Sequence, residues 1–219
     1  IKIEAGDIQG VNHGLASLLQ LIMTAKDAQL PVLTIQDKPA FGYRGLMLDC
    51  ARHFWTVDEL KETLDHMAFF KLNTLHMHLT DNQAWRLSMD KYPDLVKEGT
   101  YYYDFPELSG KYYSKEDLKE IVTYAGTRGI EIIPEVDLPG HSIALLAALP
   151  ELSCRGGKFE ATPEERDWNK RKRGNENMIC IGNPQSFAFA EDVIDALIEI
   201  FPSQYIHFGG DEVPTDIWE

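Results

Sequence analysis

Residues 45–81 read GLMLDCARHFWTVDELKETLDHMAFFKLNTLHMHLTD, and this stretch contains the pattern that decides the fold. Residues 45–49 and 73–79 are short apolar runs that predict buried strands. Between them, Thr56 and Glu59 have the spacing of a capping box, which predicts that a helix begins there. A strand, a helix and a second strand in this order predict two parallel strands joined by a helical crossover.

The same alternation continues along the chain. Further helices are predicted to begin at Ser114 and at the Asn183–Pro184 pair. Further strands are predicted at 130–135 and at 205–208. Polar clusters follow the strand ends, as on the active face of a TIM barrel. A doubly wound sheet would usually have a glycine-rich phosphate loop after an early strand, and this chain has none. We therefore expect an α/β protein of TIM type, a (β/α) barrel.

A complete barrel of this type has eight strands and about 250 residues. The four predicted strands would make residues 41–219 the first half of a (β/α)8 catalytic barrel. Residues 1–40 do not fit the repeat. A helix is predicted at 11–25 and a short strand at 31–35, followed by a linker. We interpret residues 1–40 as the C-terminal remnant of a preceding α/β domain plus this linker. The chain opens with Ile1 and has no signal-peptide pattern, so we expect a processed or excised piece.

The charge of the chain excludes some partners. The formal net charge is −14, which argues against nucleic acid or an anionic membrane surface. The basic run at 170–173 follows an acidic stretch and is interpreted as a solvated loop. No apolar run is long enough to span a bilayer, so we expect no membrane insertion. Of the three cysteines, Cys50 is expected to be a buried thiol. Cys154 and Cys180 are either bridged or free.

Four segments together carry a resemblance to a known family. They are YRGLMLDCARHF at 43–54, LNTLHMHLTDNQ at 72–83, EVDLPGH at 135–141 and HFGGDEV at 207–213. Their order, spacing and position at strand ends resemble the glycoside hydrolase family 20 β-N-acetylhexosaminidases over about residues 40–219. Residues 1–40 resemble the end of that family's N-terminal α/β domain.

The resemblance implies removal of terminal, non-reducing β-linked N-acetylglucosamine or N-acetylgalactosamine by a retaining, substrate-assisted mechanism. Asp211 would orient the substrate's acetamido group as it becomes an oxazolinium. Glu212 would be the general acid and then the base. His141 would support Glu212, and Asp81 would fix His141. No cofactor or metal is implied. The partner would be an oligosaccharide or glycoconjugate, and the location would be extracytoplasmic, that is periplasmic, secreted or lysosomal.

Three further residues are candidates for substrate binding. By resemblance, Arg44 would bind sugar hydroxyls. It precedes the first strand, however, and so belongs to the end of the barrel opposite the active face, where a structural salt bridge is the alternative. Asp137 would bind substrate or hold the Pro139–Gly140 turn. Trp218 would stack on a sugar face, although single aromatic residues more often belong to a core.

Two other classes of function stay open. The polypeptide would be a catalytically incompetent fragment or a carbohydrate-binding module if its pocket is not closed, and we then expect little turnover by the 219-residue chain. Alternatively, His76 and His78 point to the same face of a strand, which is a metal-ligand arrangement. With His141, His207 and Asp211 they could form the site of a metal-dependent TIM-barrel hydrolase.

Overall fold

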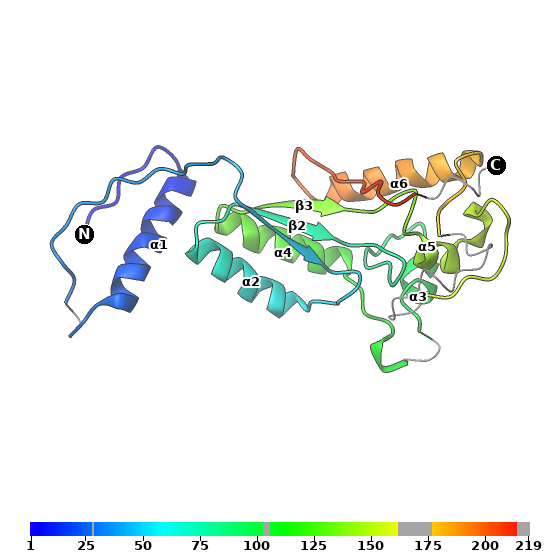
Figure 1. Ribbon diagram of the computed structural model, residues 1–219, viewed down its shortest axis with the longest axis horizontal. Helices are drawn as coiled ribbons and strands as arrows, with labels where there is room; N and C mark the ends of the chain where they lie inside the picture. The colour runs from blue at the N-terminus through cyan, green and yellow to red at the C-terminus, as the bar shows by residue number, and fades with distance from the viewer. Residues whose placement is uncertain (28, 103–105, 162–176, 214–219) are drawn as a thin grey trace.

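The computed structural model describes residues 1–27, 29–102, 106–161 and 177–213. Its centre is a parallel sheet of three strands, β1 (Gly45–Asp49), β2 (Thr74–His78) and β3 (Glu131–Glu135), in the order β1-β2-β3 (Figure 1). All three were predicted from their apolar runs, and β1 has the predicted bounds. Parallel strands that are neighbours in sequence and in the sheet are the expected beginning of a (β/α) barrel.

The register of the sheet separates polar from apolar side chains. Asp49 lies opposite His78, and His78 lies opposite Glu135, so these three residues form one row across the sheet. Side chains alternate between the two faces of a strand. Leu75 and Met77, which alternate with the histidines of β2, therefore point to the other face, where both are fully buried. One face of the sheet thus builds the core while the other presents ionisable groups.

Helices α2 (Val57–Phe69) and α4 (Lys115–Thr127) lie side by side along the sheet (Figure 1). Both predicted capping boxes are confirmed, at Thr56 and at Ser114. The two helices turn their apolar faces to the core, with buried residues Leu60, Leu64, Met67, Leu118, Ile121 and Ala125. Each large apolar side chain that becomes fully buried stabilises the fold by about 1.5–3 kcal/mol.

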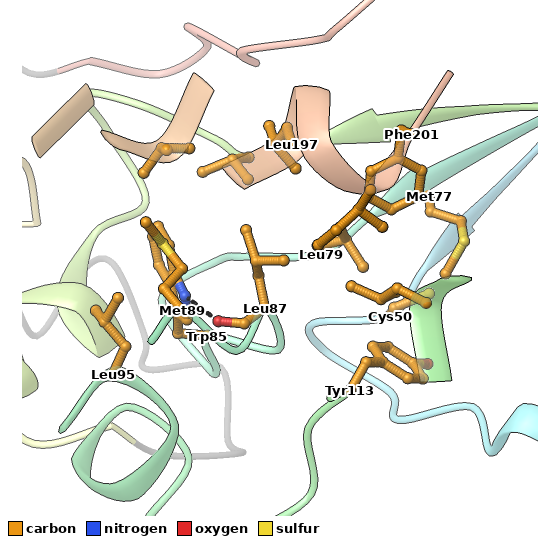
Figure 2. Packing of buried hydrophobic residues seen from close by; sticks show 14 of the residues in the cluster. Cys50, Met77, Leu79, Trp85, Leu87, Met89, Leu95, Tyr113, Leu197 and Phe201 are labelled. Carbon is orange, nitrogen blue, oxygen red and sulfur yellow. Dashed lines mark hydrogen bonds between the residues drawn. The ribbon is translucent and has the colours of Figure 1, made fainter. Parts of the chain in front are cut away.

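The predicted helix after Asn183 is α6 (Pro184–Ile200), and its N-cap is confirmed because the Asn183 side chain accepts a hydrogen bond of 3.0 Å from Gln185 N. Four short elements complete the described part of the barrel: α3 (Asp94–Glu98), η1 (Pro106–Leu108), α5 (Ile143–Ala148) and η2 (Pro150–Leu152). Residues of α6 and of the loop after β2 join those of the sheet in one cluster (Figure 2). In that cluster the Trp85 indole N–H donates to Leu87 O at 2.7 Å. The long loop after β2 is thereby part of the core.

The fourth predicted strand is only partly formed. Residues 205–208 run parallel to β3, and His207 N donates to Pro134 O at 3.0 Å while Val136 N donates to His207 O at 3.1 Å. These bonds make a single bridge between Glu135 and His207 rather than a continuous ladder. The prediction was therefore correct in position and direction and wrong in expecting a regular strand.

The N-terminal region differs from the prediction in one element. Helix α1 (Ile8–Thr24) begins three residues earlier than expected, at the side-chain cap of Asp7. The predicted strand at 31–35 is wrong, because residues 29–39 have no regular secondary structure. High β propensity makes a strand only where a second strand is available to pair with it. The division of the chain at residue 40 stays a prediction.

Cys154 and Cys180 are bridged, which settles the alternative that the sequence left open. Cys50 is a buried free thiol as predicted, and burial raises its pKa to about 12. In the part of the chain that the structure describes, none of the helices has the length and apolar character needed to cross a bilayer. The basic run at 170–173 lies outside the described residues.

Candidate active site

Polar residues from three chain segments meet beyond the C-terminal ends of the strands. Asp81 follows β2, Asp137 and His141 follow β3, and all three are at most 5% exposed. Asp211 and Glu212 follow the bridge at His207, and their side chains are 63% and 66% exposed. The structure therefore brings together five of the seven predicted site residues.

His141 is at the centre of this group. Its Nδ1 lies 3.1 Å from Asp81 Oδ1, and its Nε2 lies 3.3 Å from Glu212 Oε2 and 3.6 Å from Asp211 Oδ2. The hydrogen bond to Asp81 raises the pKa of His141. The imidazole is thus hydrogen-bonded to a buried carboxylate through Nδ1, while its Nε2 faces two exposed carboxylates without a hydrogen bond to either. A histidine placed between carboxylates in this way can relay a proton once both contacts are hydrogen bonds.

Two of these residues have strained backbones. His141 has a φ of 47° and Glu212 a φ of 48°. A residue with a side chain pays on the order of 1–2 kcal/mol for this left-handed conformation, and such strain is typical of sites where a side chain must be held in one place. The buried and hydrogen-bonded surroundings of His141 offset that cost.

Asp81 is held by cations on one side and by His141 on the other. Its Oδ2 lies 2.8 Å from an Arg52 guanidinium nitrogen and 3.1 Å from His78 Nε2. Burial would raise the pKa of Asp81, but the hydrogen bonds with His141 and His78 lower it well below its usual range. The surroundings of Asp81 therefore favour its ionised form.

Asp137 lies under the turn that carries the acidic pair. Its Oδ1 accepts a hydrogen bond of 3.0 Å from Gly210 N, and its own N–H donates to Thr80 Oγ1 at 3.0 Å. A carboxylate oxygen of Asp137 lies within 4.8 Å of one of Asp211. Burial, with a further contribution from the charge of Asp211, raises the pKa of Asp137 to about 6. Asp137 thus holds the turn of the acidic pair, which is not the Pro139–Gly140 turn that the sequence suggested, and it also faces Asp211.

Arg52 joins the site, although the sequence reasoning assigned it no role. Its guanidinium contacts Asp49 at 2.6 Å and Asp81 at 2.8 Å, and its side chain is 40% exposed. The sequence did contain an indication of this role, because Arg52 stands three residues after the end of β1, where active-face residues of a barrel are found.

Arg44 lies elsewhere. It precedes β1, and the five residues of that strand span about 16 Å. Its guanidinium donates to Lys71 O at 2.8 Å and to Phe41 O at 2.7 Å. These bonds close the N-terminal end of the sheet, so the structure does not support the sugar-binding role predicted for Arg44. Trp218, the third predicted binding residue, lies outside the described residues.

The metal-site alternative meets a specific difficulty. Both ring nitrogens of His78 face carboxylates, Nε2 at 3.1 Å from Asp81 and Nδ1 at 3.2 Å from Glu135. Burial would lower the pKa of His78, but these two hydrogen bonds raise it to about 10. A protonated imidazole has no lone pair for a metal, so the contacts of His78 with Asp81 and Glu135 compete with metal binding at this residue. Among the described residues, four sets come close enough together to hold a cation: His76, Glu135 and His207; Asp81, Asp137 and His141; His141, Asp211 and Glu212; and Glu135, Asp137 and Asp211.

Comparison with known sequences identifies the family. Residues 41–219 match the sequence profile of Glycosyl hydrolase family 20, catalytic domain. The chain belongs to glycosyl hydrolase family 20. Its three parallel strands are accordingly part of a TIM-type (β/α) barrel.

Curated relatives and solved structures agree with this assignment. The family 20 chain is 41% identical to a β-hexosaminidase of Akkermansia muciniphila and 39% identical to one of Porphyromonas gingivalis, over 99% and 100% of its own length. It spans 44% and 28% of those two relatives. A crystal structure of a Vibrio harveyi family 20 exo-β-N-acetylglucosaminidase in complex with N-acetylglucosamine matches 98% of the chain, with a TM-score of 0.83 and 36% identity, over 35% of that protein.

Proposed function

We propose that the protein removes terminal, non-reducing β-linked N-acetylglucosamine or N-acetylgalactosamine from oligosaccharides or glycoconjugates, with retention of configuration. The observation that carries the proposal is the line from Glu212 through His141 to Asp81, with Asp211 beside it. Family 20 hexosaminidases use substrate-assisted catalysis, and two adjacent carboxylates in one turn can take the two separate roles that this chemistry needs.

In the first step, Glu212 donates its proton to the glycosidic oxygen while the bond from that oxygen to the anomeric carbon breaks. The acetamido oxygen of the same sugar attacks the anomeric carbon, and an oxazolinium forms. Asp211 accepts a hydrogen bond from the acetamido N–H and stabilises the positive charge that develops there. The leaving alcohol departs with the proton from Glu212.

In the second step, Glu212 acts as the base. It takes a proton from a water molecule whose oxygen attacks the anomeric carbon, and the oxazolinium ring opens to restore the acetamide. Each step inverts the anomeric centre, so the product has the configuration of the substrate. His141 lies 3.3 Å from Glu212 and is positioned to stabilise its anionic form between the two steps.

The comparisons support the substrate class. The Vibrio harveyi structure contains N-acetylglucosamine, which is the product expected for this chain. Arg52 is the one guanidinium that the described residues bring to the acidic cluster, and it is suited to hydrogen-bond sugar hydroxyls. No nucleic-acid partner and no membrane insertion are proposed. That the reaction needs no cofactor or metal stays a prediction.

We also propose that the protein works outside the cytoplasm. The disulfide between Cys154 and Cys180 supports this location, because structural disulfides persist in oxidising compartments.

A second candidate is that the 219-residue chain by itself binds glycans but has little turnover. The exposure of Asp211 and Glu212, at 63% and 66%, favours it. A general acid and an oxazolinium-stabilising carboxylate act most strongly where water is excluded. We expect the isolated chain to turn over an aryl β-N-acetylglucosaminide only weakly, and robust turnover would refute this candidate.

Replacement of the acid tests the enzymatic proposal. Glu212→Gln removes the proton donor and leaves a side chain of the same size. In a protein that extends this chain to the length of its relatives, we expect kcat on an aryl β-N-acetylglucosaminide to fall by at least about a hundredfold. Glu199→Gln, on the exposed surface of α6, is the matched control. Wild-type activity in Glu212→Gln would contradict the proposed function.

A further inference from the structure

We propose that His78 is a positioning residue of this active site: a buried imidazolium that holds Asp81 so that its other oxygen faces His141. The inference rests on the proposed function, which gives His141 and Glu212 their roles. It extends the line of contacts inward, from Glu212, His141 and Asp81 to His78 and then Glu135.

The geometry favours a proton on each ring nitrogen of His78. Its Nε2 lies 3.1 Å from Asp81 Oδ2, and its Nδ1 lies 3.2 Å from Glu135 Oε1. An ionised carboxylate only accepts hydrogen bonds. A neutral imidazole has one N–H, so it would turn a lone pair toward one of the two carboxylates. An imidazolium donates to both, and the raised pKa of His78, about 10, agrees with that state.

Burial makes this charge consequential. His78 is 6% exposed, Asp81 is 2% exposed and Glu135 is 5% exposed. Charges at such depth interact more strongly than they would in water, and an unpaired one is costly. The pKa of Asp81 and the pKa of Glu135 both lie well below their usual ranges, and hydrogen bonds with histidines are a cause in both cases. His78 is the residue that touches both carboxylates.

The sheet fixes this contact. The register places Asp49, His78 and Glu135 in one row across β1, β2 and β3. His78 therefore has an acidic residue opposite it on each neighbouring strand. Asp81 follows His78 by three residues, at the point where the chain leaves β2. The backbone N–H of the next residue, Asn82, donates to Asp81 Oδ1 at 2.6 Å. With Oδ2 bound by His78 and Arg52, Asp81 keeps Oδ1 toward His141.

Charged and titratable groups lie along and around the line of contacts from Glu212 to Glu135, and they come from every segment packed against it. On β1 and its following turn they are Asp49 and Arg52, on β2 His76, on β3 Glu135, and beyond β3 Asp137, His141, His207 and Asp211. Loss of the positive charge of His78 leaves Asp81 with less compensation. Every nearby acid then holds its proton more tightly, so the limbs of the pH–rate profile move to higher pH.

The first test reads the protonation state of His78 directly in the 219-residue chain. Nitrogen-15 NMR of the imidazoles distinguishes a ring with two N–H groups from a neutral ring. We expect His78 to carry both protons at pH 8, where an ordinary histidine is neutral. A neutral His78 at pH 8 would overturn the proposal, whatever the activity of the protein.

The second test uses paired variants in a protein with measurable turnover, extended to the length of its relatives. His78→Gln keeps an N–H donor near Asp81 but has no charge. His76→Gln is the matched control, because His76 lies on the same strand and contacts Glu135 at 2.5 Å but has no contact with Asp81 among those recorded for the described residues.

We expect His78→Gln to lower kcat by at least about tenfold with KM little changed, and to move the pH–rate limbs upward by about half a unit or more. His76→Gln should leave both within about twofold and 0.2 pH units of wild type, by the same reasoning. Equal effects of the two variants, or unmoved limbs in folded His78→Gln, would overturn the proposal. Absence of turnover in the wild-type protein would instead contradict the proposed function, and the NMR result would still decide whether Asp81 is paired with an imidazolium.

Discussion

Asp137 is the carboxyl group of the site that the fold most strongly favours in its protonated form. It is 2% exposed, faces Asp211, and has a single backbone N–H, that of Gly210, on its Oδ1. Its pKa is raised to about 6, whereas the pKa of Asp81, with cations beside it, is lowered. Two buried aspartates in one site therefore differ in charge state between pH 4 and pH 6, because of their neighbours rather than their depth.

This difference predicts a pH-dependent effect of Asp137→Asn on stability. A carboxyl group whose folded pKa lies above its unfolded pKa stabilises the fold at low pH, and that contribution is lost as the pH rises through about 6. Asparagine keeps an acceptor for Gly210 N and never ionises. We expect the variant to be more stable than wild type by about 1–3 kcal/mol at pH 8 and equal to it at pH 4. Urea unfolding at the two pH values measures this, and an equal difference at both would contradict it.

The two arginines at either end of β1 show what a sequence can tell about single residues. The candidate catalytic carboxylates and His141 were predicted by motif and strand-end position, and the structure gathers them. The binding arginine was assigned to Arg44, which precedes the strand. Arg52, which follows it, contacts Asp81. The same side chain eight residues away reaches a different end of the barrel, and only the rule that active sites lie at strand C-termini distinguishes the two.

At the scale of elements, the turn at 207–213 carries the acidic pair, and two glycines shape it. Gly209 and Gly210 have φ values of 56° and 87°. A Cβ on Gly209 would lie 2.0 Å from Asp137 Oδ1, whereas a Cβ on Gly210 would meet no atom within 4 Å. The close approach of the turn to Asp137 is what lets Gly210 N donate to that carboxylate.

Paired alanine substitutions separate these two roles. Gly210→Ala should cost about 1–2 kcal/mol of stability, the ordinary penalty of an alanine in the left-handed region. Gly209→Ala should cost at least about 2 kcal/mol more, because it also displaces the Asp137 carboxylate. Chemical denaturation of both variants gives the comparison. Equal free energies of unfolding for the two variants would show that the turn can move away from Asp137 at no cost and that Asp137 does not hold it.

Elements with their own local signals were the ones that sequence predicted well. The capped helices and three strands carry such signals in the capping boxes and apolar runs. The segments at 31–35 and 205–208 look equally strand-like, but a strand also needs a partner of matching register. The first has none among the described residues, and the second pairs with β3 only around His207. Pairing depends on distant parts of the chain, which local patterns do not report.

At the scale of the whole molecule, residues of the sheet and its helices form one hydrophobic cluster (Figure 2). The site residues lie on loops that follow the strands of this sheet. The disulfide between Cys154 and Cys180 constrains the loop that ends at residues 177–180. Next to Cys180, Ile179 N donates to Pro139 O at 3.0 Å and Ser142 N donates to Asn177 O at 2.8 Å. The segment at 177–180 thus lies against the turn that bears His141.

Reduction of the disulfide should therefore weaken the fold near the site. The bridge joins residues 26 apart, and loop-closure entropy for a loop of this length predicts a contribution of about 3.5 kcal/mol. We expect a thiol reductant to lower the free energy of unfolding of the wild-type chain by about 2–4 kcal/mol. The double variant Cys154→Ser, Cys180→Ser should be unaffected by the reductant. An unchanged unfolding midpoint for reduced wild type would contradict the prediction.

The central claim is that Asp211 and Glu212 serve a reaction in which the substrate's acetamido oxygen is the nucleophile. The most direct measurement compares kcat/KM for aryl β-glycosides whose acetyl group carries zero, one, two or three fluorine atoms, in a protein extended to the length of its relatives. Fluorine makes the amide oxygen a poorer nucleophile and leaves Asp211 and Glu212 untouched. We predict that kcat/KM falls with each fluorine, by more than about tenfold across the series. Equal rates across the series would contradict the account, because the nucleophile would then have to come from elsewhere.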